Sequence, residues 1–292
     1  MTWQFTLTGL LIGALVGLTG MGGGSLMTPA LVFLFGFDPV TAIGTDVLHG
    51  AIFKSVGGLR HHRLGTVQAR LSGWMLAGSA PASLGGVALA TWLHRRYGGG
   101  LDSVEGIVLG AVLLAGGLGM LLKALVRFRS HPEEFVLRRR DRLAAVAIGL
   151  LGGFLVGLTS VGSGVFFGLT LLVVFPLRAH KVVGTDIVHA AALLWVAGIG
   201  HLVAGNVDLH TLAWLLLGSI PGVLAGSQLT LAVGDRPLRL LLALVLLVSG
   251  ARLALPGGIA WIAVAAVCVV LVALVAVRLA RAPVAVEARV AE

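Results

Sequence analysis

The chain is poor in cysteine and in acidic residues. Of its 292 residues one is cysteine, 12 are Asp or Glu, and charged residues of both signs make up 11%. The lone Cys268 excludes an intrachain disulfide and any metal site built from several cysteines. So few polar groups cannot cover an apolar core in water, and the composition therefore excludes an ordinary soluble protein.

The motifs of common hydrolytic enzymes are also missing. The sequence contains no His-Glu-x-x-His segment and no Gly-x-Ser-x-Gly segment, which are typical of zinc-dependent and serine-dependent hydrolases. Its longest polar stretch, residues 127–142, is too short to form a catalytic domain. We therefore expect no enzyme activity, no cofactor and no bound metal.

Long apolar runs dominate instead, with 58% hydrophobic residues and a mean hydropathy of +1.02. A helix of about 20 apolar residues crosses a bilayer. The windows that qualify are residues 41–59, 69–93, 104–126, 181–203, 209–233, 238–255 and 259–279. The 43 glycines suit helices that pack closely in lipid. The composition predicts an all-α polytopic protein whose surroundings are the lipid bilayer.

Basic residues gather between these windows and give a net charge of +9. They occupy residues 60–70 and 127–142 and the pairs at 178 and 181, 236 and 239, and 278 and 281. The connections 36–41 and 204–209 contain an aspartate each but no Lys or Arg. Because basic loops stay in the cytoplasm, we expect an inner (plasma) membrane protein with its N-terminus outside and its C-terminus inside. Only the basic residues 94–96 oppose this topology, and nothing in the pattern indicates nucleic acid.

The chain also repeats itself. Residues 9–92 align without gaps with residues 149–232, at a constant offset of 140. The loop 36–41 is predicted outside and its mate 176–181 inside, so each half crosses the membrane an odd number of times. This pattern predicts two inverted-topology repeats, as in many secondary transporters, with the substrate site between them.

Each half begins with two apolar stretches that are too short to span and are separated by glycines. They are residues 5–20 and 25–36 in the first half, and 143–159 and 165–176 in the second. We interpret both as glycine-broken or re-entrant helix pairs, each followed by three spans. The backbone N–H groups of a restarting helix suit an anion. The substrate-binding candidates are Thr19, Gly22, Gly23, Gly24 and Ser25, with Thr159, Ser160, Gly162, Ser163 and Gly164. Alternatively, the glycines only let two helices cross closely.

A second repeated motif is Gly-Thr-Asp-x-x-His. It places Asp46 and His49, and likewise Asp186 and His189, on one helix face about a turn inside a span. Ionisable groups at that depth usually face a cavity or a partner, and we interpret these four as proton-coupling residues. The alternative is an aspartate that caps the helix start and a histidine that satisfies a backbone carbonyl.

Three further residues are given structural interpretations. Lys54 stands inside a span where its repeat mate is Leu194, and we expect its ammonium to extend to the cytoplasmic headgroups. The alternative is that it neutralises an anion or pairs with Asp46. His61 and His201 lie at span ends and are interpreted as interfacial.

These features divide the chain into five parts. Residues 1–127 form the first transmembrane repeat, 128–142 a basic cytoplasmic linker, and 143–255 the second repeat. Residues 256–280 form one extra C-terminal transmembrane helix, and 281–292 a disordered tail.

The chain resembles the TauE/SafE family of sulfite exporter–like permeases (TSUP). The resemblance rests on the glycine breaks after Gly-Leu-Thr, the Gly-Thr-Asp start of the next span and the two-fold internal repeat. The resemblance covers about residues 5–255. It implies a carrier of sulfite, sulfoacetate or another small sulfur-containing anion. Ser160 and Ser163 depart from the glycine-only break of the first half.

The prediction is therefore a secondary transporter of a small anion that works by alternating access. The rival hypothesis is a carrier or channel for a metal ion or Na⁺ that uses the repeated Asp and His residues. Few acidic residues lie within the spans, which opposes it. A homo-oligomer is compatible with the sequence.

Overall fold

A computed structural model describes residues 2–19, 24–98, 104–125, 135–229, 235–255 and 259–281, and in these ranges the chain is helical without strands. The first half contains α1 (Thr2–Thr19), α2 (Gly24–Phe35), α3 (Pro39–Arg63), α4 (Ala69–Tyr97) and α5 (Val104–Leu125). The second half contains α6 (Arg139–Thr159), α7 (Phe166–Val174), α8 (Ala179–Val203), α9 (Leu209–Leu229) and α10 (Asp235–Ala254), and α11 (Ala260–Arg281) follows. These helices confirm the predicted all-α polytopic fold and its extra C-terminal helix.

Five of the helices are long and apolar enough to cross a membrane, namely the segments Ala69–Tyr97, Arg139–Thr159, His180–Val203, Leu209–Gly226 and Ala260–Val277. The predicted span 41–59 lies in α3, which is 25 residues long but carries more polar side chains. Those side chains face the bundle: Asp46, His49 and Lys54 are all buried. These three side chains are therefore shielded from lipid by the other helices.

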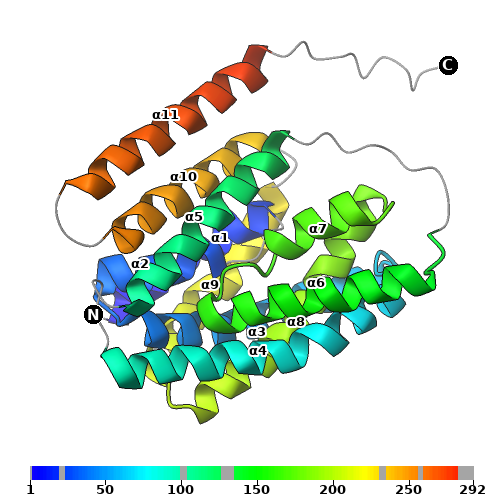
Figure 1. The fold of residues 1–292 in the computed structure, drawn as a ribbon, viewed down its shortest axis with the longest axis horizontal. Helices are drawn as coiled ribbons and strands as arrows, with labels where there is room; N and C mark the ends of the chain where they lie inside the picture. The colour runs from blue at the N-terminus through cyan, green and yellow to red at the C-terminus, as the bar shows by residue number, and fades with distance from the viewer. Residues whose placement is uncertain are drawn as a thin grey trace.

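The bundle interlocks helices of one half with helices of the other. α1 packs along α9, and α6 packs along α4 (Figure 1). A Cβ atom on Gly13 would strike the backbone of Ser219, and one on Gly153 would strike the backbone of Ser79. The two contacts are related by the 140-residue offset, so the repeat in the sequence is also a repeat in the packing.

The equivalent helices α3 and α8 pack against each other in opposite directions. A Cβ on Gly198, near the end of α8, would lie 3.1 Å from the Cα of Leu48, in the first half of α3. At the other end of the pair, a Cβ on Gly58 would lie 3.7 Å from the Cα of Val188. These two contacts are also related by the offset. The equivalent helices α3 and α8 are therefore antiparallel.

The second predicted break is present. α6 ends at Thr159 and α7 begins at Phe166, and the residues between them have three positive φ angles, at Ser160 (62°), Gly162 (129°) and Gly164 (120°). Glycine adopts such angles without strain. In the first half α1 ends at Thr19 and α2 begins at Gly24, but residues 20–23 lie outside the described residues.

The helix that opens the second half begins before its apolar run. The apolar stretch starts at residue 143, whereas α6 begins at Arg139. The side chain of Asp141 accepts a hydrogen bond of 2.8 Å from the backbone N–H of Arg138. This cap starts the helix within the basic segment, before the apolar run begins. The predicted tail after residue 281 lies outside the described residues.

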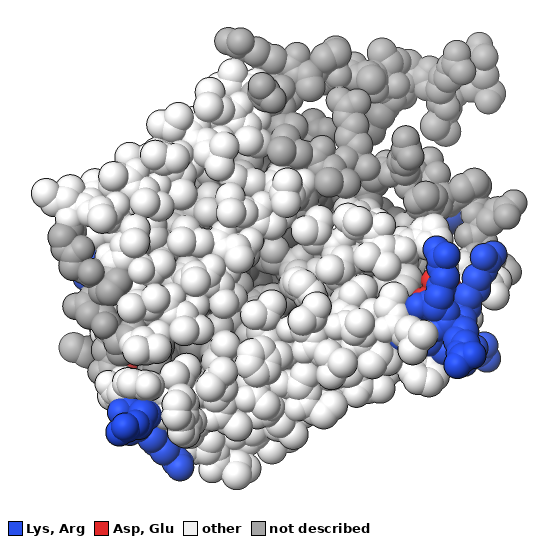
Figure 2. Space-filling view, viewed as in Figure 1, with Lys and Arg blue, Asp and Glu red and all other residues white. Residues whose placement is uncertain are grey.

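The basic segments meet at one end of the bundle. Lys181 donates a hydrogen bond of 2.7 Å to the carbonyl of Gly65, which joins the start of α8 to the end of α3. The guanidinium of Arg142 lies over the ring of Trp74, near the start of α4. Asp38 is at the other end, where His94 lies 3.7 Å from it. In the view of Figure 2, Lys and Arg gather at two opposite ends and the surface between them carries none.

α11 stands outside the interlocked halves. It lies along α10 and α5 on one face of the molecule (Figure 1). Most of its side chains are exposed, as expected for a helix with lipid on most sides. α11 therefore packs on the outside of the pair formed by α5 and α10.

Candidate functional site

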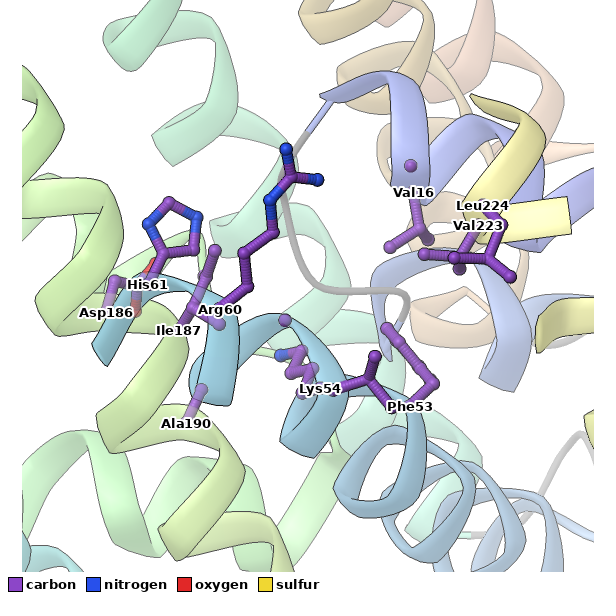
Figure 3. Close-up of a pocket in the computed structure, with 14 residues that line it drawn as sticks. Val16, Phe53, Lys54, Arg60, His61, Asp186, Ile187, Ala190, Val223 and Leu224 are labelled. Atoms are coloured by element: carbon purple, nitrogen blue, oxygen red, sulfur yellow. The ribbon is translucent and has the colours of Figure 1, made fainter. Parts of the chain in front are cut away.

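A cavity of about 230 Å³ lies between the two halves. α1 and α3 of the first half form part of its wall, and the second break, α8 and α9 form the rest. In Figure 3, Phe53, Lys54 and Arg60 of α3 lie across the cavity from Val16, Val223 and Leu224. The polar lining is Lys54, Arg60, His61 and Asp186. The structure therefore places a mostly apolar cavity with several charged groups where the repeat predicted the substrate site.

Lys54 is buried, with 5% of its surface exposed. Its ammonium donates hydrogen bonds to the carbonyl of Ser163 (3.1 Å) and to the hydroxyl of Ser163 (2.9 Å). It also interacts electrostatically with Asp186 and with Asp46. The expectation that Lys54 extends to the headgroups is therefore wrong, because its polar partners lie inside the protein.

Asp46 is fully buried at the other end of the same break. Its Oδ2 accepts hydrogen bonds from the hydroxyls of Thr28 (2.5 Å) and Ser160 (2.8 Å). Ser160 thus binds Asp46 while Ser163 binds Lys54. The second break consequently runs along α3 between these two charges, a distance of about 12 Å for eight helical residues.

The capping interpretation of the Asp-His motif is wrong. α3 begins at Pro39 and its N-cap is Asp38, which accepts a hydrogen bond from Thr41 N–H. Asp46 is about two turns further along the helix. Asp186 is likewise well inside α8, which begins at Ala179, and it lines the cavity. Helix capping therefore does not explain why either aspartate lies inside a span.

The two motif histidines make equivalent contacts across the repeats. His49 Nε2 lies 2.7 Å from the hydroxyl of Ser219 on α9, and His189 Nε2 lies 2.9 Å from the hydroxyl of Ser79 on α4. Both histidines and both serines are buried. Each histidine therefore binds a side chain of the other half, not a backbone carbonyl as the alternative supposed.

Replacing Ser79 with alanine should destabilise the protein by about 1–3 kcal/mol, because buried His189 loses its hydroxyl partner. Thermal unfolding of the purified protein in detergent measures the change. Ser83→Ala is the matched control: Ser83 is buried on the same helix, and its hydroxyl donates only to the carbonyl of Ala80. Equal melting temperatures for the two variants would show that the histidine–serine contact contributes nothing.

The second break presents fewer free amides than the sequence predicts. At the start of α7 the N–H groups of Phe166 and Phe167 both donate to the carbonyl of Gly162, at 3.1 and 3.4 Å. Thr159 is buried, and its hydroxyl donates to the carbonyl of Leu155. Of the predicted contacts in this break, Gly164 lines the cavity, while Ser160 and Ser163 bind the charged residues of α3.

The first break cannot be placed in the same way. Gly22 and Gly23 lie outside the described residues, and for Thr19, Gly24 and Ser25 only the helical backbone is described. Their predicted contact with substrate stays a prediction. The interpretation of His201 as interfacial is wrong, because this residue is fully buried and its Nε2 lies 2.9 Å from the carbonyl of Gly157.

Three basic residues of the cavity are absent from the predicted substrate-binding set. Lys54, Arg60 and His61 all lie on α3 and line the cavity. One signal was present in the sequence: Lys54 interrupts the repeat, since its mate is Leu194. Because only the first half has a charged residue at this position, the packing that the two halves share does not depend on that charge.

Comparison with known proteins agrees with this architecture. The family model for sulfite exporter TauE/SafE matches residues 5–253. A Bacillus subtilis (strain 168) protein named "Probable membrane transporter protein YjnA" is 38% identical over 258 residues, which cover 87% of this chain and all of the relative. "Probable membrane transporter protein YdhB" of the same organism is 26% identical, over 75% of this chain and 86% of the relative.

A more distant relative comes from an archaeon. "Probable membrane transporter protein MJ0441" of Methanocaldococcus jannaschii is 22% identical, over 84% of this chain and 92% of the relative. No solved structure matches the chain. With most of its length matched by the family model and by a relative of nearly equal extent, this chain belongs to the sulfite exporter TauE/SafE family of membrane transporters.

Proposed function

We propose that the protein is a secondary transporter that moves a small anion, sulfite or an organosulfonate, across the inner membrane. The observation that carries the proposal is the cavity between the halves, which contains the buried ammonium of Lys54. A charge inside a membrane protein is costly and usually marks a substrate or ion pathway. Arg60 lies about 9 Å further along α3. It adds a second positive charge to the lining of the cavity.

Alternating access is supported by the packing of the two halves. α3 and α8 run in opposite directions, and each half contacts the other through α1 with α9 and α6 with α4. If α3 and α8 both cross the bilayer, the repeats have inverted topology, and exchanging their conformations would move the opening of the cavity from one side to the other. The end of the bundle where Arg142 and Lys181 lie would be cytoplasmic, by the positive-inside rule.

Proton coupling is the second part of the proposal. Asp46 and Asp186 each lie about two turns inside a helix, on α3 and α8 respectively. One carboxylate oxygen of Asp46, Oδ1, has no hydrogen-bond partner among the described residues, which leaves it able to take a proton. His49 and His189 lie three residues after Asp46 and Asp186 and bind serines of the opposite half. Protonation of these groups would therefore change the charge at the interface between the halves.

The rival hypothesis of a cation carrier finds an obstacle in Lys54. Its ammonium interacts with both Asp186 and Asp46, the two carboxylates that such a carrier would need for its ion. A metal ion or Na⁺ would have to displace this fixed positive charge. The described residues also contain no group of three or more His, Cys, Asp or Glu side chains suited to a metal.

The proposal is tested by accumulation of labelled sulfite in proteoliposomes under an imposed pH gradient, with protein-free vesicles as the control. We expect saturable uptake that exceeds the control and is inhibited by sulfoacetate and thiosulfate. Sulfate and nickel serve as further competitors. Movement of nickel without movement of sulfite would overturn the anion assignment and favour the rival.

A further inference from the structure

Lys54 is an asymmetric feature in an otherwise repeated packing. The equivalent position of the second half is Leu194, whose side chain is also buried, with 1% exposed. Leu194 packs against Gly50 on the antiparallel neighbour α3. The fold thus accommodates a buried leucine at one of the two equivalent positions and a buried lysine, bound to Ser163, at the other.

Charged and neutral polar groups from several elements surround Lys54. From α8 the carboxylate of Asp186 interacts with it, and from its own helix that of Asp46. The break contributes the neutral Ser163, and the histidines at 49 and 189 each bind a neutral serine. Arg60 and His61 line the same cavity as Lys54 and Asp186, whereas Asp46 is not part of the lining. Asp186 is therefore the carboxylate that shares the cavity with the ammonium of Lys54.

We propose that Lys54 binds the transported anion in this cavity, and that the anion replaces the carboxylate of Asp186 as the counter-ion of the ammonium. The inference rests on the proposed function and identifies its binding group. Lys54 and Asp186 both line the cavity, so an anion that enters meets this pair directly.

The exchange requires a proton. An anion beside Lys54 and an ionised Asp186 would place two negative charges on one ammonium in a medium of low dielectric constant, where repulsion is strong. A proton on Asp186 removes this repulsion. Anion affinity should consequently rise as the pH falls, and each bound anion should bring a proton with it.

The cavity also selects the class of anion. Its volume of about 230 Å³ is below that of pockets for drug-sized ligands, so the substrate is small. Among the described lining residues Lys54 is the one lysine, and Phe53, Val16 and Val223 supply apolar walls. A single negative charge with an apolar side fits these walls better than a dianion does, because unpaired charge against apolar surface is costly.

Methanesulfonate and sulfate provide the comparison, because they have similar size and shape but carry one and two charges. Binding to the purified protein is measured by titration calorimetry at several pH values; the charge of methanesulfonate is constant across them. We expect methanesulfonate to bind more tightly than sulfate, with an affinity that rises as pH falls. Equal binding of both anions, or none by either in a wild-type protein that transports sulfite, would overturn the inference.

The variants then separate the roles of the two residues. Lys54→Leu, which copies the mate Leu194, should lower methanesulfonate affinity at least about tenfold. Asp186→Asn should raise the affinity several-fold and remove most of its pH dependence, a gain that a misfolded variant would not give. Lys181→Leu is the control: it removes a lysine from the same end of the bundle, outside this cavity.

The outcomes distinguish the inference from the proposed function. Unchanged affinity in Lys54→Leu, or reduced affinity in Asp186→Asn, would overturn the inference while sulfite transport by the wild type still supported the proposed function. Absence of any anion transport by the wild type would instead overturn the proposed function, and the inference with it. If Lys54→Leu does not fold, Lys54→Met and the sign of the Asp186→Asn effect decide the question.

Discussion

Replacing Gly153 with valine should prevent the two halves from packing together and destabilise the protein by about 3 kcal/mol or more. Gly153 is buried on α6, and a Cβ there would strike the Cα and the carbonyl of Ser79 on α4. Backbone atoms cannot move aside as a flexible side chain can. The yield of monodisperse protein after extraction and its melting temperature measure the effect.

Gly73→Val is the matched control. Gly73 lies on α4 within the same helix pair, and a Cβ there would have nothing within 4 Å. The control therefore measures only the change in helix propensity, which favours valine over glycine. Gly13→Val, at the position equivalent to Gly153, should repeat the large effect at the α1–α9 contact. A Gly153→Val protein as stable as the Gly73→Val protein would contradict the close helix approach.

The second large effect concerns coupling. Asp46→Asn or Asp186→Asn should abolish accumulation of sulfite driven by a pH gradient while counterflow exchange continues. Asparagine retains the size of the side chain but cannot take up a proton, so the gradient no longer drives the anion. One proton per anion accumulates substrate up to about tenfold for each pH unit, and this factor should fall to the level of protein-free vesicles.

Asp38→Asn is the control for this experiment. Asp38 is the N-cap of α3, a position that asparagine fills as well as aspartate, so accumulation should be unchanged. Accumulation that persists in the double variant Asp46→Asn with Asp186→Asn would remove both carboxylates from the coupling mechanism. Loss of both accumulation and counterflow would indicate a structural role for them.

The position of the site followed from the repeat, whereas the identity of its charged partners did not. The 140-residue offset predicted that the halves meet at a shared interface, and the cavity lies there. The expectation for Lys54 was nevertheless wrong, because its partner Ser163 is 109 residues away in the sequence. The residues near a lone lysine in a span predict that its ammonium extends to the nearest water. They contain no signal for a hydroxyl partner that is distant in the sequence.

The Asp-His motif illustrates the same limit. Spacing placed Asp46 and His49 on one helix face, and the structure has both buried in α3. Each also has a partner in the other half, Ser160 for Asp46 and Ser219 for His49. A cap at the start of the span was a reasonable local alternative, but a real cap exists two turns earlier at Asp38.

The sequence by itself determined the helices, the second glycine break and the internal repeat, since each depends on apolar length, glycine content or direct comparison of segments. Only the tertiary structure decided that Lys54 binds Ser163 of the break and lines the same cavity as Asp186, instead of reaching the membrane surface. The physical reason is that burial in lipid constrains which segments are apolar, whereas the pairing of buried charges depends on how helices far apart in the chain pack together.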